Sequence, residues 1–390
     1  MHPQGNGDQP LVVYAAGTRW DGLRGTDQQL ASALADGAHV VYVDPPVSLT
    51  NVLRGVTGWP RSTVTRIGPT LTRVSPVGPP LQTRPFLRAV STALHRRAIT
   101  GAVRALGRPV DAMVVASLEP VMKAVPARMT VLFGTDDFVA GARLMNRSAA
   151  WLAERERRQL RRADTVVVVS SVLAERWRAL GAEPHVVENG CDIRTFAECE
   201  SSEPAADVPA DGYAIYVGNI SSRLDIEVFE VLAQADVPVV LVGPVAPEWR
   251  TERFRALTEL PQVTWTGPVP YTELARYYGR ARVGLLPYVE SAFNSASSPL
   301  KAYEYLAAGL PVVASQLPDG AAVLRQHVTI APTQPGFAEA TANAVASVPT
   351  PAERASRRAV AATCDWSVRA AQFAAAVGLP WRVASRGGFS

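Results

Sequence analysis

Short apolar runs alternate with helix-like stretches along most of the chain. In its first half, runs rich in valine and other strand-forming residues occur at 11–16, 39–46, 110–117, 129–134, 164–170 and 184–190. Helical patterns lie at 148–162 and 171–180, and Thr26 followed by Gln29 fits a capping box that opens another helix. Near-continuous apolar strands separated by helices predict a parallel sheet that helices cover on both faces.

The alternation stops at residues 198–212, ECESSEPAADVPADG, whose acidic, small and proline residues are typical of a linker. Helical stretches close the chain from about residue 337, and before them the apolar runs resume at 213–219, 237–244, 262–267, 282–288 and 310–315. A chain of 390 residues also exceeds one ordinary core of about 100–200 residues. We therefore predict two doubly wound α/β domains, at 1–200 and 201–365. A C-terminal helix and tail at 366–390 are expected to pack back toward the first domain.

The composition narrows the class of protein. Hydrophobic residues make up 47% and charged residues 19%, which indicates a globular protein and excludes a disordered one. The net charge of +4 does not favour a nucleic-acid partner. No apolar run reaches the roughly 20 residues of a membrane span, and the first ten residues lack the pattern of a signal peptide. The three cysteines have no metal-ligand spacing, so we expect a soluble, cytoplasmic protein without a disulfide framework.

One region is strongly basic. Between Asp44 and Asp111 no acidic residue occurs, and ten arginines give this region +10 against +4 for the whole chain. Its arginines are Arg54, Arg61, Arg66, Arg73, Arg84, Arg88, Arg96, Arg97, Arg104 and Arg108. Within it, residues 84–108 place apolar side chains at roughly helical spacing. Three interpretations are open: an ordinary amphipathic helix with solvated arginines, weak peripheral contact with anionic lipid, or part of a site for an anionic or lipid-linked acceptor.

The segment SSPLKAYEYLAAGLPVVAS (297–315) carries the clearest local signal. Ser298 suits an N-cap and Gly309 a left-handed C-terminal cap, which predicts a helix of about ten residues with Lys301 and Glu304 on one face. A lysine in the first turn opposes the helix dipole unless an anion binds at that terminus. Glu304 could then accept hydrogen bonds from ribose hydroxyls. The alternative is a surface ion pair between Lys301 and Glu304.

The run PLKAYEYLAAGLPVVAS resembles the donor-site signature of GT-B nucleotide-sugar glycosyltransferases, in particular family four. Residues 20–46 resemble the N-terminal part of a bacterial subgroup that includes teichuronic-acid-type transferases. The segments at 154–196, 216–233 and 363–377 resemble later parts of the same family, in the same order. The resemblance implies a GT-B fold, in which two Rossmann-like domains form the active site in the cleft between them.

The resemblance also implies an activity. Such enzymes move a sugar from a nucleotide diphosphate sugar to an acceptor hydroxyl, with retention of configuration, without a cofactor and without a metal. The context would be cell-envelope glycan or secondary-metabolite glycosylation in a bacterium, with a small molecule or a lipid-linked glycan as acceptor. The protein would be cytoplasmic or bound peripherally to the inner face of the membrane. No G-x-G-x-x-G, G-x-S-x-G or P-loop motif indicates other chemistry, and no Asp-x-Asp or histidine cluster indicates a divalent metal.

Two alternatives stay open, because the family pattern has gaps. Ala296 stands where relatives have the first of two glutamates, and the histidine of the N-terminal domain has no clear counterpart in residues 114–120. A catalytically weak glycosyltransferase-like partner subunit would show such losses. A nucleotide-sugar epimerase of the same fold is the other alternative.

The resemblance and the strand ends together select the site residues. Arg223 matches the arginine that relatives set against the diphosphate, and Lys301 replaces a lysine expected near Asp225. We assign to donor binding Gly17, Gly218, Asn219, Arg223, Asn294, Ser297, Ser298, Lys301 and Glu304. The residues Trp20, Asp21, Arg24 and Asp136 are assigned to the acceptor side, with an ordinary loop as the alternative.

The catalytic residues are predicted to be Arg223, Lys301 and Asp137. Asp136 and Asp137 end a strand in FGTDD, where a carboxylate either contacts substrate hydroxyls or caps the following turn. No metal ligands are assigned. The scattered histidines are predicted to be structural and hydrogen-bonded: His39, His95, His185 and His327.

Overall fold

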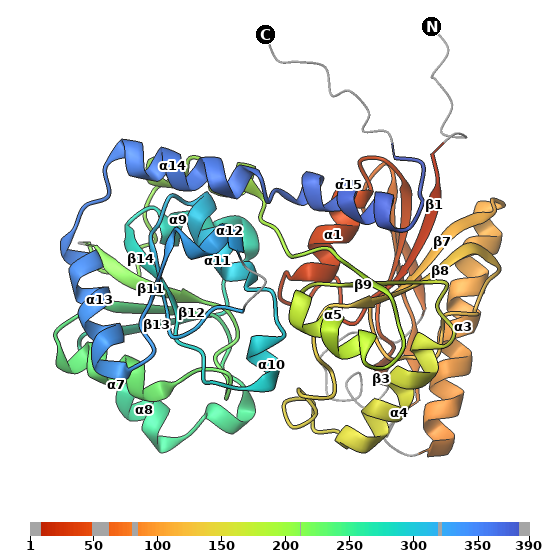
Figure 1. Ribbon diagram of the computed structural model, residues 1–390, viewed down its shortest axis with the longest axis horizontal. Helices are drawn as coiled ribbons and strands as arrows, with labels where there is room; N and C mark the ends of the chain where they lie inside the picture. Colours follow the sequence, from red (N-terminus) through yellow and green to blue (C-terminus); the bar gives the residue numbers. More distant parts are fainter. Residues whose placement is uncertain (1–8, 49–61, 80–84, 211, 319–321, 382–390) are drawn as a thin grey trace, which may run out of the picture. The chain divides into compact units, whose positions relative to one another are not determined.

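A computed structural model describes residues 9–48, 62–79, 85–210, 212–318 and 322–381. The chain forms two compact units (Figure 1). The first comprises the described residues up to Val169, Leu173–Val187 and the described residues from Ser367 onward. The second comprises Ser170–Val172 and Glu188–Trp366.

The first unit is built on a sheet with the strand order β10-β9-β8-β7-β1-β2-β5-β4, in which β4 alone is antiparallel to its neighbour. Its strands are β1 (Leu11–Ala15), β2 (His39–Val43), β4 (Thr63–Arg66), β5 (Leu71–Ser75), β7 (Val110–Val115), β8 (Ala127–Gly134), β9 (Thr165–Val168) and β10 (Pro184–Val186). A separate parallel pair joins β3 (Val47–Ser48) and β6 (Val77–Gly78). The strand order reverses between β1 and β7.

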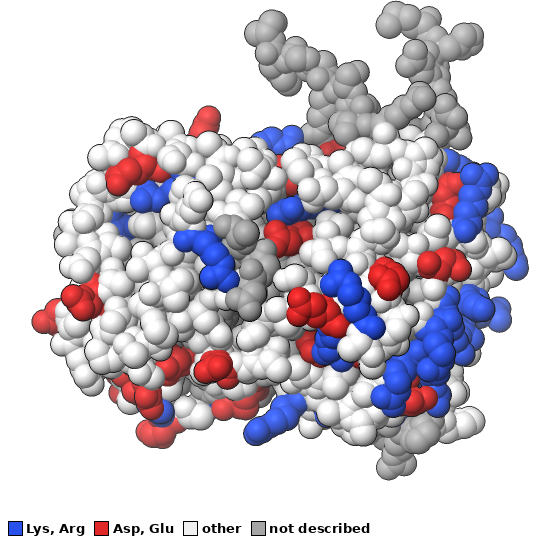
Figure 2. Space-filling view, viewed as in Figure 1, with Lys and Arg blue, Asp and Glu red and all other residues white. Residues whose placement is uncertain are grey.

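The helices of this part of the chain are α1 (Thr26–Leu34), α3 (Pro85–Leu106), α4 (Ala149–Leu160), α5 (Ser171–Arg178) and α15 (Trp366–Ala376). Helix α3 is continuous through Gly101, and its inner side buries Ile99 and Ala102. Arginine and lysine side chains gather over α3 on the surface of this unit (Figure 2). Arg54, Arg61 and Arg84 of the basic region lie outside the described residues.

The predicted start of α1 is wrong by one residue. Gly25 is the N-cap, and Gln28 rather than Gln29 reaches back, its Oε1 accepting from the Gly25 N–H at 3.1 Å. Thr26 is therefore the first helical residue. A threonine next to the true cap satisfied the sequence pattern equally well.

The second unit is built on a fully parallel sheet with the order β13-β12-β11-β14-β15-β16. Its strands are β11 (Tyr213–Val217), β12 (Val239–Val242), β13 (Val263–Gly267), β14 (Ala281–Leu286), β15 (Val312–Ala314) and β16 (Val328–Ile330). This is the doubly wound order 3-2-1-4-5-6, which reverses between β11 and β14. Ligands of such sheets bind at that reversal, outside the carboxyl ends of the strands.

The helices of the second unit surround its sheet. They are α6 (Ile193–Phe196), α7 (Ile226–Gln234), α8 (Glu252–Thr258), α9 (Leu274–Tyr278), α10 (Ala292–Ser295), α11 (Leu300–Ala307), α12 (Ala322–Arg325), α13 (Gln334–Ala346), α14 (Pro351–Ala362) and the 3₁₀ helices η1 (Cys199–Ser201), η2 (Pro247–Trp249) and η3 (Tyr271–Glu273). Along β11, Tyr213 and Ile215 belong to one buried cluster and Ala214 and Tyr216 to another. Alternate side chains of one strand thus serve two cores, which confirms the predicted α/β class with both sheet faces covered.

The segment at 198–212 is not a free linker in its described residues. Cys199 and Ala205 are buried in the core of the second unit, and Glu200 forms ion pairs with Arg354 and Arg358 of α14 at 3.0 and 2.8 Å. Acidic and small residues marked this segment as exposed. The charge of Glu200 is instead compensated by two arginines of α14. The second unit includes Glu188–Trp366, so the predicted domain limit at residue 200 lies inside it.

Among the helices that the structure describes, none is both long enough and apolar enough to cross a membrane.

Candidate functional site

The predicted donor-binding residues of the second unit gather at the sheet reversal. Gly218 and Asn219 follow β11 directly, and Arg223 lies in the loop that leads to α7. Asn294 lies in α10, after β14, and Lys301 lies in the first turn of α11. The loops after β11 and β14 therefore bring residues from separate parts of the chain to one edge of the sheet.

Arg223 is held in place by both loops. Its Nε donates to Asn294 Oδ1 at 2.9 Å, while Asn294 Nδ2 donates to the carbonyls of Arg223 and Val289 at 3.1 and 2.9 Å. The guanidinium carbon also lies 5.2 Å from the ring centre of Tyr288 and 4.8 Å from that of Phe293, within cation–π range. Asn294 is buried, so its amide orients a fixed positive charge at the end of β11.

Lys301 and Glu304 form a buried ion pair. Lys301 Nζ donates to Glu304 Oε2 at 2.8 Å, and the two side chains are only 17% and 1% exposed. Tyr278 donates to the same oxygen at 3.3 Å, and burial, together with the Glu304 charge, raises the pKa of Tyr278 well above its ordinary value. Within the described residues, Glu304 Oε1 has no hydrogen-bond partner. This pair is therefore not the solvated surface contact that the spacing alone allowed.

The predicted capping role of Ser298 is wrong. The N-cap of α11 is Pro299, and Ser298 Oγ instead accepts from the backbone N–H of Asn189 at 3.0 Å. Asn189 Nδ2 donates to the Ser298 carbonyl at 3.0 Å, so this pair of contacts fixes Ser298 before the helix begins. Ser297 is likewise occupied, since its hydroxyl donates to the Asn294 carbonyl at 2.8 Å.

The predicted end of α11 is confirmed. Gly309 has φ +78°, and the N–H of Leu310 donates to the Tyr305 carbonyl at 2.9 Å, as in a Schellman cap.

Two glycines allow the segments that follow β11 and β12 to approach each other closely. Gly218 and Gly243 have φ of +149° and +139°, and a Cβ on Gly243 would lie 1.9 Å from the Gly218 carbonyl oxygen. Gly243 was not among the residues predicted from the sequence, although it follows β12 as Gly218 follows β11. Asn219 is exposed, and its carbonyl accepts from the Tyr216 hydroxyl at 3.1 Å.

In the first unit, the buried carboxylate of Asp27 holds the loop after β1 in place through hydrogen bonds. Asp27 accepts from the backbone N–H groups of Gly17 and Thr18, and from the Tyr14 hydroxyl, each at 2.9 Å. Burial raises the pKa of Asp27, and these hydrogen bonds oppose the shift. A Cβ on Gly17 would lie 2.7 Å from the Ala116 carbonyl, so a close backbone approach requires this glycine.

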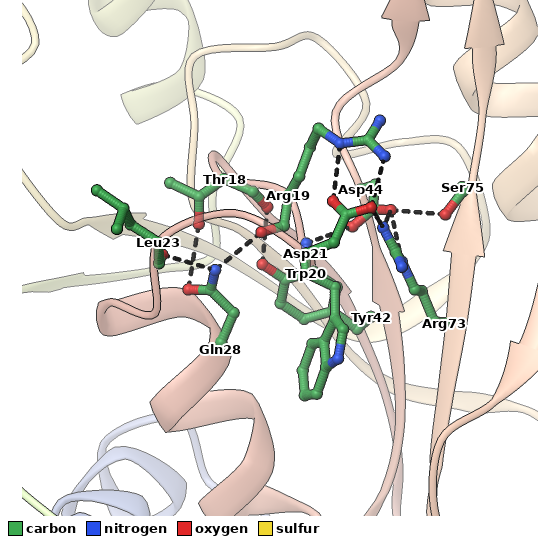
Figure 3. Close-up of polar contacts among 10 residues, drawn as sticks. All are labelled: Thr18, Arg19, Trp20, Asp21, Leu23, Gln28, Tyr42, Asp44, Arg73 and Ser75. Carbon is green, nitrogen blue, oxygen red and sulfur yellow. Dashed lines mark hydrogen bonds and ion pairs between the residues drawn. The ribbon is translucent and has the colours of Figure 1, made fainter. Parts of the chain in front are cut away.

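The next part of this loop carries Trp20 and Asp21 (Figure 3). The Trp20 N–H donates to Asp44 Oδ1 at 2.8 Å, and Arg73 bridges Asp44 and Asp21 at 2.7 and 3.0 Å. Hydrogen bonding from Arg19 lowers the pKa of Asp21 to about 2. Asp44 and Arg73 were not assigned to the site from the sequence, although Asp44 ends a strand in VDPP.

Arg24 donates to Ser32 of α1 at 3.5 Å. Of the two acidic residues after β8, Asp137 is buried and caps the following turn by accepting from the N–H groups of Val139 and Ala140 at 3.1 and 2.9 Å. Its other oxygen pairs with Arg176 at 2.9 Å. Asp136, half-buried, accepts from the Phe138 N–H through its carbonyl at 3.1 Å.

A pocket of about 440 Å³ lies in the first unit, and Gly17 is among its lining residues. His95 of α3 also lines it, and the prediction of a satisfied structural histidine is wrong for this residue. His95 is buried, and its Nε2 has no hydrogen-bond partner in the described part of the chain. Burial lowers the pKa of His95 to about 4, so the imidazole is neutral near pH 7. Over the described ranges, no three His, Cys, Asp or Glu side chains gather as a metal site would require.

Comparison with known proteins finds a family match within the second unit. The family described as Glycosyl transferases group 1 matches residues 213–348. TuaH of Bacillus subtilis (strain 168), named as a teichuronic acid biosynthesis glycosyltransferase, is 32% identical over 181 residues. That match covers 44% of this chain and 45% of the relative, so the chain aligns with less than half of the relative's length.

Solved structures give the fold. Sucrose-phosphate synthase from Thermosynechococcus elongatus superposes with a TM-score of 0.72 at 20% identity, over 94% of this chain and 98% of that one. WaaG, a glycosyltransferase involved in lipopolysaccharide biosynthesis, superposes with a TM-score of 0.64 at 15% identity, over 97% of this chain and 100% of that one. The α,α-trehalose-phosphate synthase from Burkholderia xenovorans, solved with glucose-6-phosphate, superposes with a TM-score of 0.67 at 15% identity, over 95% of this chain and 100% of that one. The predicted GT-B fold is thereby confirmed.

Proposed function

We propose that the protein transfers a sugar from a nucleotide diphosphate sugar to an acceptor hydroxyl, since residues 213–348 match the family Glycosyl transferases group 1. The observation that carries the proposal is the pair of held cations at the reversal of the second sheet. Arg223 is oriented by Asn294, and Lys301 is paired with buried Glu304. Both stand beside strand ends where doubly wound sheets bind nucleotides.

These cations suit the chemistry of the departing diphosphate. As the bond to the sugar breaks, negative charge develops on the leaving phosphate, and prearranged cations stabilise it more than they stabilise the bound donor. We assign this role to Arg223 and Lys301. Glu304 Oε1, without a partner among the described residues, is available to accept a hydroxyl of the nucleotide ribose.

Asp137 has a different role in this proposal. Its carboxylate already binds two backbone N–H groups and Arg176, so it positions the turn after β8 rather than touching the reacting atoms. We also propose that the transfer retains the configuration of the sugar. In this step the acceptor oxygen bonds to the sugar carbon that the diphosphate leaves, and the departing phosphate takes the proton of the acceptor hydroxyl. Such a step needs no separate carboxylate base.

Binding of the donor is the direct test. A nucleotide sugar at 100 times its Kd should stabilise the protein by about 2.7 kcal/mol, visible as a raised melting temperature. The panel is UDP, GDP, dTDP and ADP with their sugars, followed by incubation with the radiolabelled donor. Transfer or slow hydrolysis supports a transferase, conversion of the sugar supports an epimerase, and binding without turnover supports a partner subunit. No stabilisation by any member contradicts the donor site.

For the acceptor we propose a hydroxyl of a cell-envelope glycan or its precursor. TuaH, 32% identical over 181 residues, is named for teichuronic acid biosynthesis. A lipid-linked glycan as acceptor would place the reaction at the membrane surface. A small-molecule acceptor is the alternative.

The outer face of α3 supports weak membrane contact. Phe86, Arg97 and Arg104 are exposed and lie 11 and 7 residues apart, a spacing that puts them on one face of a helix. Phe86 is 77% exposed, and each arginine near an anionic surface contributes about 1 kcal/mol. This combination of an apolar side chain with cations is typical of peripheral helices.

We therefore expect salt-sensitive co-sedimentation with anionic liposomes. Because the contact is electrostatic, binding at low salt should fall sharply at high salt. The double change Arg97→Glu and Arg104→Glu should abolish it, whereas neutral liposomes serve as the control. Absence of binding to anionic liposomes at low salt would contradict this contact.

A further inference from the structure

The pocket of the first unit lies where the order of its sheet reverses. Ala16 and Gly17 follow β1, Pro45 and Pro46 follow β2, and residues 117–119 follow β7. Helices α3 and α4 complete the walls. The carboxyl edge at such a reversal is where open α/β sheets bind ligands. The volume of about 440 Å³ falls within the roughly 300–1,000 Å³ of small-molecule sites.

Arginines dominate the charge of this pocket. Arg88, Arg147 and Arg155 line it, and Glu119 is the one acidic residue among its described lining residues. Three positive charges against one negative charge leave a formal +2. Burial lowers the pKa of Arg155, Glu119 opposes this, and the nearby charges of Arg88 and Arg147 add to the lowering. Like charges crowded together in this way are costly unless an anion compensates them.

Two of these arginines are held by the same indole ring. The guanidinium carbons of Arg88 and Arg155 lie 4.5 and 4.6 Å from the ring centre of Trp151. Arg155 is further fixed because its Nε donates to the Leu118 carbonyl at 2.9 Å and its Nη2 to Glu119 at 3.3 Å. The cations are thus preorganised by packing, as a binding site requires.

The remaining lining offers neutral polar groups beside apolar ones. His95 presents a buried Nε2 that lacks a partner among the described residues, and Ser91, Thr92 and Ser117 supply hydroxyls. Phe138 and the two prolines form apolar surface. Hydroxyl-bearing ligands with an anionic group match this mixture, because the imidazole and the hydroxyls can bind neutral oxygens while the arginines bind charge.

We propose that this pocket binds a phosphate group of the acceptor, with Arg88, Arg147 and Arg155 as its ligands and His95 as partner of a neighbouring hydroxyl. The inference rests on the proposed function, whose acceptor it assigns to a chemical class. Phosphate is favoured because the planar fork of arginine matches its oxygens in bidentate fashion. The phosphate belongs either to a free sugar phosphate or to a lipid-linked one, and the experiment separates these sources.

Calorimetric titration of the full chain tests the pocket. The probes are glucose 6-phosphate and inorganic phosphate, with glucose as the neutral counterpart. We expect the two phosphates to bind and glucose to bind far more weakly. Arg88→Gln should weaken binding about 10-fold or more, since a charge-assisted hydrogen bond is lost. The matched control is Arg128→Gln, an arginine of the same unit that is 77% exposed and does not line the pocket, which should leave the affinity unchanged.

A second variant guards against loss of folding. Arg147 is exposed and precedes α4, so Arg147→Gln should preserve the fold and still weaken phosphate binding several-fold. Vesicles of phosphatidylcholine with and without phosphatidic acid then test the lipid-linked source. Vesicle binding that falls with Arg88→Gln and Arg147→Gln supports a lipid phosphate in the pocket. If neither free phosphates nor vesicles bind in a manner sensitive to Arg88 and Arg147, the pocket assignment is overturned.

The outcomes for the two proposals are distinguishable. Donor stabilisation by nucleotide sugars reports on the second unit and should persist in Arg88→Gln. If the donor binds and turns over while no phosphate occupies the pocket, the acceptor class is wrong and the proposed function stands. If phosphates bind through Arg88 but no nucleotide sugar binds, the proposed function fails and the pocket stands.

Discussion

The change Glu304→Gln is expected to lower kcat/KM for the nucleotide sugar by roughly 10- to 100-fold. The glutamine keeps the shape of the side chain and an oxygen that can accept from Tyr278, but it removes the charge that pairs with Lys301 at 2.8 Å. The substitution also weakens the hydrogen bond that we propose between Glu304 and a ribose hydroxyl. The measurement is steady-state kinetics with the donor identified by the thermal panel.

Lys301→Ala is expected to lose activity to a similar extent, and to cost stability as well. Removing one partner of a buried ion pair leaves an uncompensated charge, at about 3–5 kcal/mol. The double variant Lys301→Met with Glu304→Gln removes both charges together and separates the two effects. Lys301→Arg should also be impaired, because a planar fork does not replace a point charge.

A matched control exists on the surface of the same unit. Glu252 and Arg255 of α8 have the same spacing as the buried pair and an ion pair of 3.3 Å, but their side chains are 86% and 65% exposed. Glu252→Gln should change neither activity nor stability appreciably. Donor turnover at the parent rate in Glu304→Gln would show that the donor-site assignment is wrong.

Gly243→Ala is expected to destabilise the protein by about 2–6 kcal/mol. The methyl group would sit 1.9 Å from the Gly218 carbonyl oxygen, which is backbone and has little freedom to move. A φ of +139° adds strain of about 1–3 kcal/mol, and overpacking adds about 1–3 kcal/mol. The melting temperature and the urea midpoint should both fall.

Gly101→Ala is the opposite case and serves as the control. Gly101 lies inside α3, where an added Cβ meets nothing within 4 Å, so the protein should gain about 0.5–1 kcal/mol. A Gly243→Ala protein that melts with the parent would mean that the approach of the two strand ends is not rigid.

Strands with a continuous apolar run could be predicted from the sequence, and strands without one could not. Strands such as β1 and β11 are buried on both faces, so every position is apolar and the run stands out. Strand β4 is exposed along its whole length, and β5 carries Arg73 in its middle. Neither has the continuous apolar run that marked the predicted strands.

Only the parts of the site that depend on residues close together in sequence could be predicted. The shared helix of Lys301 and Glu304 follows from residues three apart. The contact of Arg223 with Asn294 joins residues 71 positions apart and depends on how β11 and β14 pack. The pairing of Glu200 with Arg354 is longer still in sequence, and it turned an apparent linker into part of the core. Side-chain partners at such separations are set by tertiary packing, which single-sequence patterns do not contain.

Helix α15 makes the order of synthesis matter. Its Phe373 is buried against Phe133 of β8, with ring centres 5.4 Å apart, although the whole second unit is translated between them. At about 5–20 residues per second, the ribosome takes roughly 10–40 s to add that intervening stretch. Throughout this interval the nascent first unit exposes the apolar surface around Phe133 that α15 later covers. We expect chaperones that hold nascent chains to act on that surface, and the first unit to reach its final packing only after the second has emerged.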